Sequence, residues 1–165
     1  MSHELRILVD PQVSPLLIIE LENHLMDIFP FDSVNTRKDV QLPSSCWNAS
    51  RHQFNANCLL TFATSFFPSG IVVLLISKDA YVQGLNFVFG IALKGLGAIV
   101  SVYRLENDPE FIQKEITHEL GHVFGLKHCK LPCVMTFSNS VWEAKLKRSI
   151  FCEKCRKEIM VFRKK

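Results

Sequence analysis

The sequence has little of what marks fibrous, disordered or low-complexity chains. Glycine and proline number only seven each among 165 residues, too few for a collagen-like or low-complexity chain. No internal repeat and no linker interrupts the chain. Hydrophobic residues make up 48% and charged residues 21%, an ordinary balance for a soluble globular protein that excludes a disordered chain or a coiled coil. We therefore expect one domain that buries its own core.

Strong charge of one sign is also lacking. The formal net charge of +3 is too small to indicate a polyanionic partner. The charge is uneven, because residues 143–165 hold nine basic and three acidic side chains, a local +6, whereas residues 1–142 hold ten basic and thirteen acidic ones, a local −3. A solvated basic surface explains the C-terminal segment most simply, and nucleic-acid binding is the more specific but less favoured alternative.

Targeting and membrane-spanning segments are missing as well. The N-terminal Met-Ser-His-Glu-Leu-Arg has no basic region followed by an apolar stretch and a small-residue cleavage site, so the sequence predicts a cytoplasmic protein in a reducing compartment. Residues 84–102 are the only stretch that resembles a membrane span, but they contain Lys94, Asn86 and four glycines. Two buried strands joined by a glycine-rich turn explain this stretch better, and we expect no membrane contact.

Alternating strands and helices in the first hundred residues indicate an α/β fold. The wholly apolar run 71–76 is typical of a central parallel strand. This order predicts a mostly parallel sheet covered by helices. The predicted strands are residues 5–9, 34–40, 71–76, 85–93 and 98–103, the predicted helices are residues 15–29 and 53–67, and residues 43–48 are predicted as a loop.

A longer helix is predicted to begin at Asp108-Pro109. Asp108 is suited to the N-cap, Pro109 to the first helical position, and Glu110 to the positive end of the helix dipole. A wide apolar face follows, and Gly125 is a typical C-terminal stop. A cysteine-rich loop and a final helix at residues 153–162 complete the predicted elements.

Residues with metal-binding chemistry lie at the end of this long helix. His118 and His122 are four residues apart, so both imidazoles lie on one helix face and can bind one ion. Glu119 points beside that ion, where a general base for a water molecule belongs. His128 lies too far along a continued helix, but a left-handed turn at Gly125 can swing it back. Three neutral imidazoles with an open fourth position are typical of catalytic zinc.

Two close pairs of cysteines follow the third histidine. They are Cys129 with Cys133 and Cys152 with Cys155. This spacing favours a four-thiolate zinc site over two short-loop disulfides in a reducing compartment. Such a site is coordinatively closed and therefore structural. Cys46 and Cys58 have no partner in this pattern, and we expect them to be small buried residues rather than ligands or nucleophiles.

The run from His118 to His128 resembles the extended signature of the metzincin metallopeptidases. The cysteines that follow, together with Met135, narrow the resemblance to the archaemetzincins, a family of zinc proteases. The resemblance implies a metzincin-like mixed sheet that is mostly parallel, with an antiparallel edge strand roofing the cleft, a backing helix, an active-site helix and a small zinc-pinned helical C-terminal part. Residues 86–93 are the candidate edge strand, against which a substrate peptide would bind in extended form.

Carried over residue by residue, the resemblance implies two zinc ions in a single metzincin-like peptidase domain. Residues 1–125 would form a sheet-and-helix N-terminal subdomain, and residues 126–165 a zinc-pinned four-cysteine C-terminal subdomain. Glu119 is implied as the general acid/base, and Met135 as the Met-turn residue beneath the histidines. The implied ligands are His118, His122 and His128 for the catalytic zinc ion and Cys129, Cys133, Cys152 and Cys155 for the structural one.

The leading hypothesis is a monomeric zinc peptidase that hydrolyses peptides or unfolded protein segments through a metal-activated water. The rival hypothesis is a zinc-ribbon-like nucleic-acid-binding module with a vestigial histidine site, although the basic tail has few aromatic residues for base stacking beyond Phe151 and Phe162. Zinc-dependent hydrolysis of a non-peptide amide is a third hypothesis. No donor for the developing oxyanion can be assigned, since Tyr81 and Tyr103, the only tyrosines, lie far from Met135 in the sequence.

Overall fold

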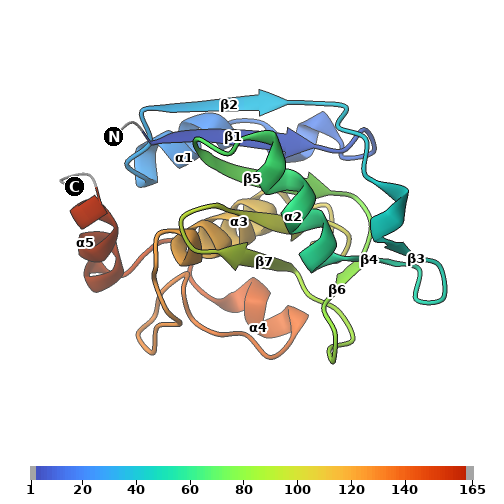
Figure 1. The fold of residues 1–165 in the computed structure, drawn as a ribbon. Helices are drawn as coiled ribbons and strands as arrows, with labels where there is room; N and C mark the ends of the chain where they lie inside the picture. The colour runs from blue at the N-terminus through green and yellow to red at the C-terminus, as the bar shows by residue number, and fades with distance from the viewer. Residues whose placement is uncertain (1–2, 163–165) are drawn as a thin grey trace.

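The computed structural model describes residues 3–162, which form a five-stranded sheet with helices on both faces (Figure 1). The strands lie in the order β2-β1-β5-β8-β7. Four of them are parallel, whereas β7 pairs with β8 in the antiparallel direction at one edge of the sheet. The predicted mostly parallel sheet with an antiparallel edge strand is therefore confirmed. The bounds are β1 Glu4–Val9, β2 Ser33–Arg37, β5 Ile71–Ile76, β7 Gly90–Leu93 and β8 Gly97–Ser101.

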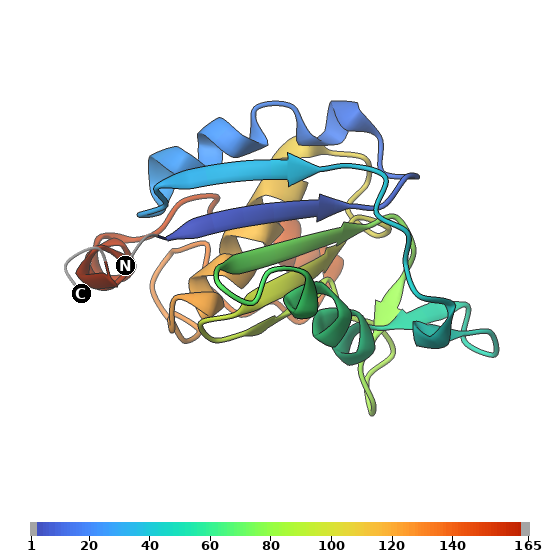
Figure 2. The same ribbon diagram turned by 45° about the horizontal axis from the view of Figure 1, so that its top comes forward.

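The two faces of the central strand β5 pack against different helices. Val73 and Leu75 belong to a core that includes residues of α1 and α3, whereas Val72 and Leu74 belong to a second core that includes residues of α2. Figure 2 shows α2 on the opposite face of the sheet from α1 and α3. Because successive side chains of a strand point to opposite faces, the apolar run is buried throughout. The helices are α1 Leu21–Ile28, α2 Ala56–Phe66 and α3 Pro109–Val123.

The helix predicted at residues 15–29 is divided into two pieces. A short 3-10 helix, η1 (Pro15–Ile18), begins at the predicted N-cap Ser14, whose side chain accepts a hydrogen bond from the N–H of Leu16. Glu20 then has a φ of 65°, in the left-handed region, so the helical backbone is interrupted before α1 begins. The apolar spacing predicted one helix because it continues across this break.

The segment predicted as a helix at residues 53–67 begins as a strand. β4 (Gln53–Asn55) lies between β3 (Trp47–Asn48) and β6 (Ala80–Tyr81) in a second, three-stranded sheet. Asn55 then caps α2, its side chain accepting a hydrogen bond from the N–H of Cys58 at 3.1 Å. The predicted loop at residues 43–48 accordingly contains η2 (Ser44–Cys46) and β3. Strands of two or three residues are too short to show a periodic pattern in the sequence.

Later elements follow the predictions more closely. The side chain of Asp108 accepts hydrogen bonds from two N–H groups in the first turn of α3, and the final helix α5 (Glu153–Val161) lies where it was predicted. The strand predicted at residues 85–93 is shorter, since only its last four residues form β7. A short helix, α4 (Val141–Leu146), was not predicted. Within residues 3–162, every helix is too short or too polar to cross a membrane.

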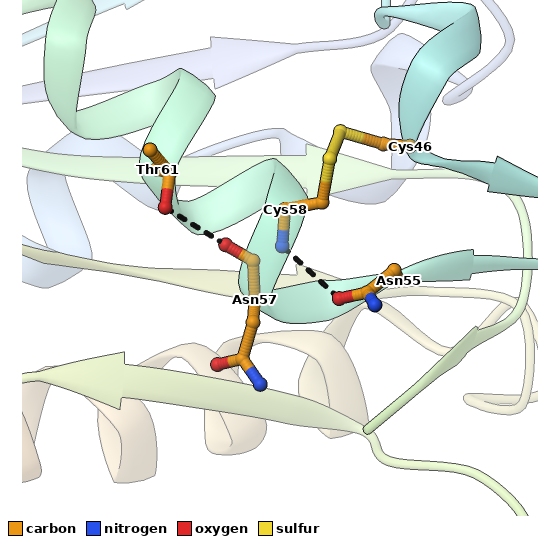
Figure 3. The surroundings of a disulfide bond; sticks show 5 residues. All are labelled: Cys46, Asn55, Asn57, Cys58 and Thr61. Atoms are coloured by element: carbon orange, nitrogen blue, oxygen red, sulfur yellow. Dashed lines mark hydrogen bonds between the residues drawn. A yellow bond between two sulfur atoms is a disulfide. The ribbon is translucent and has the colours of Figure 1, made fainter. Parts of the chain in front are cut away.

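The structure corrects the prediction for Cys46 and Cys58, which form a disulfide with their Cα atoms 5.4 Å apart (Figure 3). Cys46 ends η2 and Cys58 lies in the first turn of α2. Because residues 53–55 are a strand that pairs back on β3, the chain returns α2 to the side of η2. The spacing of the cysteines did not predict this disulfide, because the bond depends on the reversal of the chain between β3 and β4, and because disulfides are rare in the reducing compartment that the sequence predicts.

The disulfide predicts a definite thiol count. After unfolding and metal chelation without reductant, the protein is expected to expose four thiols, and reduction is expected to raise the count to six, because Cys46 and Cys58 are bonded while the other four cysteines are free. Thiol titration measures both numbers. The Cys46→Ser, Cys58→Ser double variant should show four thiols with and without reductant. Six thiols in the unreduced wild-type protein would contradict the pairing.

Candidate active site

The end of α3 and the turn after it bring three histidines together. His118 and His122 lie on one face of the helix, and their ring centroids are 4.8 Å apart. Gly125 has a φ of 92°, and the N–H of Leu126 donates to the carbonyl of Gly121 at 2.9 Å, so the helix closes in a left-handed turn. His128 returns to the helix through this turn. Its ring centroid lies 5.5 Å from that of His118 and 4.8 Å from that of His122.

The hydrogen bonds of the first two histidines fit a bound cation. Nδ1 of His118 lies 2.8 Å from the carbonyl oxygen of Val134, and Nδ1 of His122 lies 2.8 Å from that of Leu126. A carbonyl only accepts, so each Nδ1 carries the proton and each Nε2 carries a lone pair. The two Nε2 atoms are 3.2 Å apart. Two lone pairs at this separation repel each other unless a cation lies between them, and the nitrogens of all three histidines can converge on one ion.

Burial keeps these imidazoles in the neutral form that a metal requires. Desolvation, together with the nearby positive charge of Lys147, lowers the pKa of His118 to about 3. Desolvation also lowers the pKa values of His122 and His128. Each neutral ring therefore keeps one unprotonated nitrogen at neutral pH, and no proton has to leave that nitrogen before it binds a metal.

Glu119 lies beside the histidines and is almost completely buried. Its residue exposure is 7%, and burial raises the pKa of its carboxyl to about 8, with the charge of Glu115 acting in the same direction. The edge strand approaches it closely at Gly90, where an added Cβ would lie 3.0 Å from Cγ of Glu119 and 2.5 Å from the carbonyl oxygen of Ile99. Glycine at this position leaves room for the carboxyl group between α3 and β7.

A cleft of about 560 Å³ opens over these residues. One wall is β7 and the segment before it, and another is the segment that follows Met135. Met135 itself is fully buried beneath the helix. Its Sδ atom packs so closely on Gly121 that an added Cβ there would lie only 2.4 Å away. The lining includes Asn86, Phe87, Val88, Phe89, Gly90, Ile91, Ala92, Glu115, His118, Glu119, His122, His128, Phe137, Ser138, Asn139, Ser140 and Lys147.

The four remaining cysteines form a second cluster directly behind His128. Their Sγ atoms all lie within 4.8 Å of one another, and none is in a disulfide. The N–H groups of Met135 and Cys152 approach Sγ of Cys133 at 3.4 and 3.3 Å, which is the environment of a thiolate acceptor. Four sulfur donors at this separation match the ligand set of a closed zinc site. The cluster consists of Cys129, Cys133, Cys152 and Cys155.

Sequence reasoning missed several cleft residues, among them Glu115, Lys147 and Phe137. Glu115 lies three positions before His118 on the same helix face, so helical spacing alone was able to place it in the cleft. The positions of Lys147 and Phe137 in the sequence give no such indication, because they reach the cleft only through the turn after α3 and the fold of the segment around α4. The Phe137 ring centroid lies 5.1 Å from that of His128. His24 does not line this cleft, and its Nε2 atom lies 3.3 Å from Oγ1 of Thr117.

Comparisons with known proteins agree with this geometry. The model of peptidase family M54 matches residues 17–161. A relative from Nanoarchaeum equitans, described as an archaemetzincin, is 46% identical over 136 residues, which cover 82% of this chain and 78% of the relative. The crystal structure of the archaemetzincin from Methanopyrus kandleri superposes with a TM-score of 0.88 at 35% identity, covering 99% of this chain and 97% of that one. A zinc-dependent peptidase from Methanocorpusculum labreanum gives a TM-score of 0.80 at 26% identity, covering 94% and 99%.

These likenesses extend over nearly the whole chain and define a metallopeptidase of the metzincin type. The chain belongs to peptidase family M54, the archaemetzincins, and is a zinc-dependent peptidase of that family. The fold and the function predicted from the signature between His118 and Cys155 are thereby confirmed.

Proposed function

We propose that His118, His122 and His128 hold a catalytic zinc ion, and that Glu119 is the general acid/base for hydrolysis of peptides or unfolded protein segments. The observation that carries this proposal is the pair of Nε2 lone pairs 3.2 Å apart, since both Nδ1 atoms are committed to backbone carbonyls. When bound there, zinc supplies Lewis acidity, lowering the pKa of a water molecule and polarising the scissile carbonyl.

Other residues of the chain have distinct roles in the proposed hydrolysis. In its ionised form, Glu119 accepts the proton of the attacking water and returns it to the leaving amine. No protein nucleophile takes part, so no acyl-enzyme forms. Strand β7 is the edge of the sheet and lines the cleft, so its free main-chain groups can pair with an extended peptide. Met135 supports the helix from below at Gly121, and Gly125 provides the turn that returns His128.

The cysteine cluster is proposed to hold a second zinc ion with a structural role. Cys129 directly follows His128, so a metal bound by the cluster fixes the chain that carries the third histidine. Cys133 and Cys155 lie in the same core as Leu120 of the catalytic helix. This shared core favours a zinc-pinned part, residues 126–165, within one peptidase domain over an independent nucleic-acid-binding module. A monomer in the cytoplasm stays a prediction.

Metal analysis tests the proposed pair of sites. The wild-type protein is expected to carry two zinc ions per chain, and the His122→Ala variant one, because the cysteine cluster is intact in that variant. Hydrolysis of a peptide library should stop on chelation and return with added zinc. The exposed His52 gives a matched control, since His52→Ala should keep both ions and full activity. Two ions retained by His122→Ala would contradict the assignment.

A further inference from the structure

Lys147 is a buried cation in the cleft to which the proposed chemistry gives no role. Its side chain is only 5% exposed, and it directly follows α4. It lines the cleft together with Glu115, His118 and Glu119. Its Nζ atom lies 3.2 Å from Oε1 of Glu115 and 3.2 Å from Nδ1 of His118.

The ammonium group of Lys147 has more donors than these neighbours can satisfy. It carries three N–H groups. Nδ1 of His118 is protonated when it donates to Val134, so it cannot also accept a hydrogen bond from Lys147. The contact with Glu115 is an ion pair without hydrogen-bond geometry, since Oε1 of Glu115 has no hydrogen-bond partner in residues 3–162. A buried ammonium with unsatisfied donors is costly unless another acceptor reaches it.

A second polar group in the same cleft is also without a partner. Oγ of Ser138 is buried and makes no hydrogen bond in the described part of the chain. Within residues 3–162, the buried side-chain oxygens that lack a hydrogen-bond partner are this atom and Oε1 of Glu115, and both residues line the one cleft. Oε1 of Glu115 has Lys147 as its counter-ion at 3.2 Å, whereas Oγ of Ser138 has no partner of either kind among the described residues. Native proteins satisfy nearly all buried polar groups, so this hydroxyl indicates a ligand in the cleft.

The charges of the cleft favour an anionic ligand. The charged side chains that line it are Glu115, Glu119 and Lys147, whose formal charges sum to −1 when both carboxyl groups are ionised. A divalent ion held by the histidines brings the sum to +1. One additional carboxylate neutralises this formal charge, whereas a neutral ligand leaves it uncompensated.

We propose that Lys147 is a specificity-determining residue that binds a carboxylate of the peptide substrate, with the hydroxyl of Ser138 as a second donor. The inference rests on the proposed function and names its substrate class. Because Lys147 contacts His118, the carboxylate lies within about two residues of the scissile bond, roughly 7 Å of extended chain. An Asp or Glu side chain and a free C-terminal carboxylate both supply this chemistry through charge-assisted hydrogen bonds.

Peptide binding tests the proposal without requiring turnover. The zinc-loaded full-length Glu119→Gln protein is titrated with fluorescein-labelled, alanine-rich octapeptides: one with a central Asp and an amidated C-terminus, a twin with Asn, and the Asn peptide with a free C-terminal carboxylate. At least one carboxylate peptide is expected to bind about tenfold more tightly than the amidated Asn peptide, as one charge-assisted contact of about 1.4 kcal/mol allows. The peptide that binds more tightly identifies the source of the carboxylate.

Matched variants assign the preference to Lys147. Combining Lys147→Met with Glu115→Gln removes both charges of the buried pair, and should reduce the preference to about one. Lys145→Met with Glu106→Gln removes a nearby exposed ion pair and should retain it. Ser138→Ala leaves the buried pair in place and should weaken the preference about threefold, which provides a test if the double variant fails to fold.

Three results would overturn the proposal: equal affinity for all three peptides, no measurable binding of any of them, or a preference that survives the loss of Lys147. Cleavage by the wild-type protein is measured separately. A carboxylate preference without cleavage would leave this subsite standing and refute the proposed peptidase chemistry, so the two failures are distinguishable.

Discussion

Replacing Glu119 by glutamine is expected to lower kcat for peptide hydrolysis by about 10²- to 10⁴-fold while both zinc ions stay bound. Glutamine has the shape of glutamate but cannot accept the proton of the attacking water. The metal should be unaffected, because the ligand nitrogens belong to the three histidines. Steady-state hydrolysis of a quenched fluorescent peptide gives kcat, and elemental analysis of the same sample gives the zinc content.

The same helix offers a control for this substitution. Glu110 lies exposed in the first turn of α3, outside the cleft, so Glu110→Gln should have the kcat of the wild-type protein. Full activity in Glu119→Gln would refute the role of acid/base. Loss of one zinc ion in that variant would instead show that the carboxyl group helps to hold the metal.

The histidine site was predictable because its determinants are local. Two of the three histidines are fixed by the periodicity of one helix, and the third depends on a single glycine whose left-handed turn is a common helix stop. Asp108 and Pro109 likewise mark the helix start by chemistry within the first turn. The central strand was predictable for the same reason, since an apolar run of this length is buried on both faces.

The parts that the sequence did not predict depend on contacts between distant segments. Cys46 and Cys58 meet only because residues 53–55 pair as a strand, which has no signal of its own. Lys147 reaches His118 across 29 positions, through a turn and a short helix that were not predicted. Glu20 interrupts a helix whose apolar spacing continues across the break. The first two features depend on tertiary contacts for which the sequence has no local pattern, and the third interrupts a local pattern that continues on both sides of it.

Replacing Cys155 by alanine is expected to unfold much of the C-terminal part and to abolish hydrolysis with all three histidines intact. The cysteine is 4% exposed and supplies one of four sulfur donors, so its loss opens the structural zinc site. Metal bound only by the folded state contributes directly to stability. We expect a loss of about 3–5 kcal/mol, and a fall in Tm of roughly 10 °C or more. Thermal unfolding followed by circular dichroism measures this change.

The response to chelator separates loss of the metal from loss of a packed side chain. Chelation should lower the Tm of His122→Ala substantially, because that variant retains the cysteine site, and should barely change the Tm of the His122→Ala, Cys155→Ala double variant. Equal sensitivity of the two variants to chelator would show that the cysteines hold no stabilising metal. Full hydrolysis by Cys155→Ala would show that His128 keeps its position without the cluster. If Cys155→Ala loses both the stabilising metal and hydrolysis, the cysteine cluster is required to keep His128 in place for catalysis.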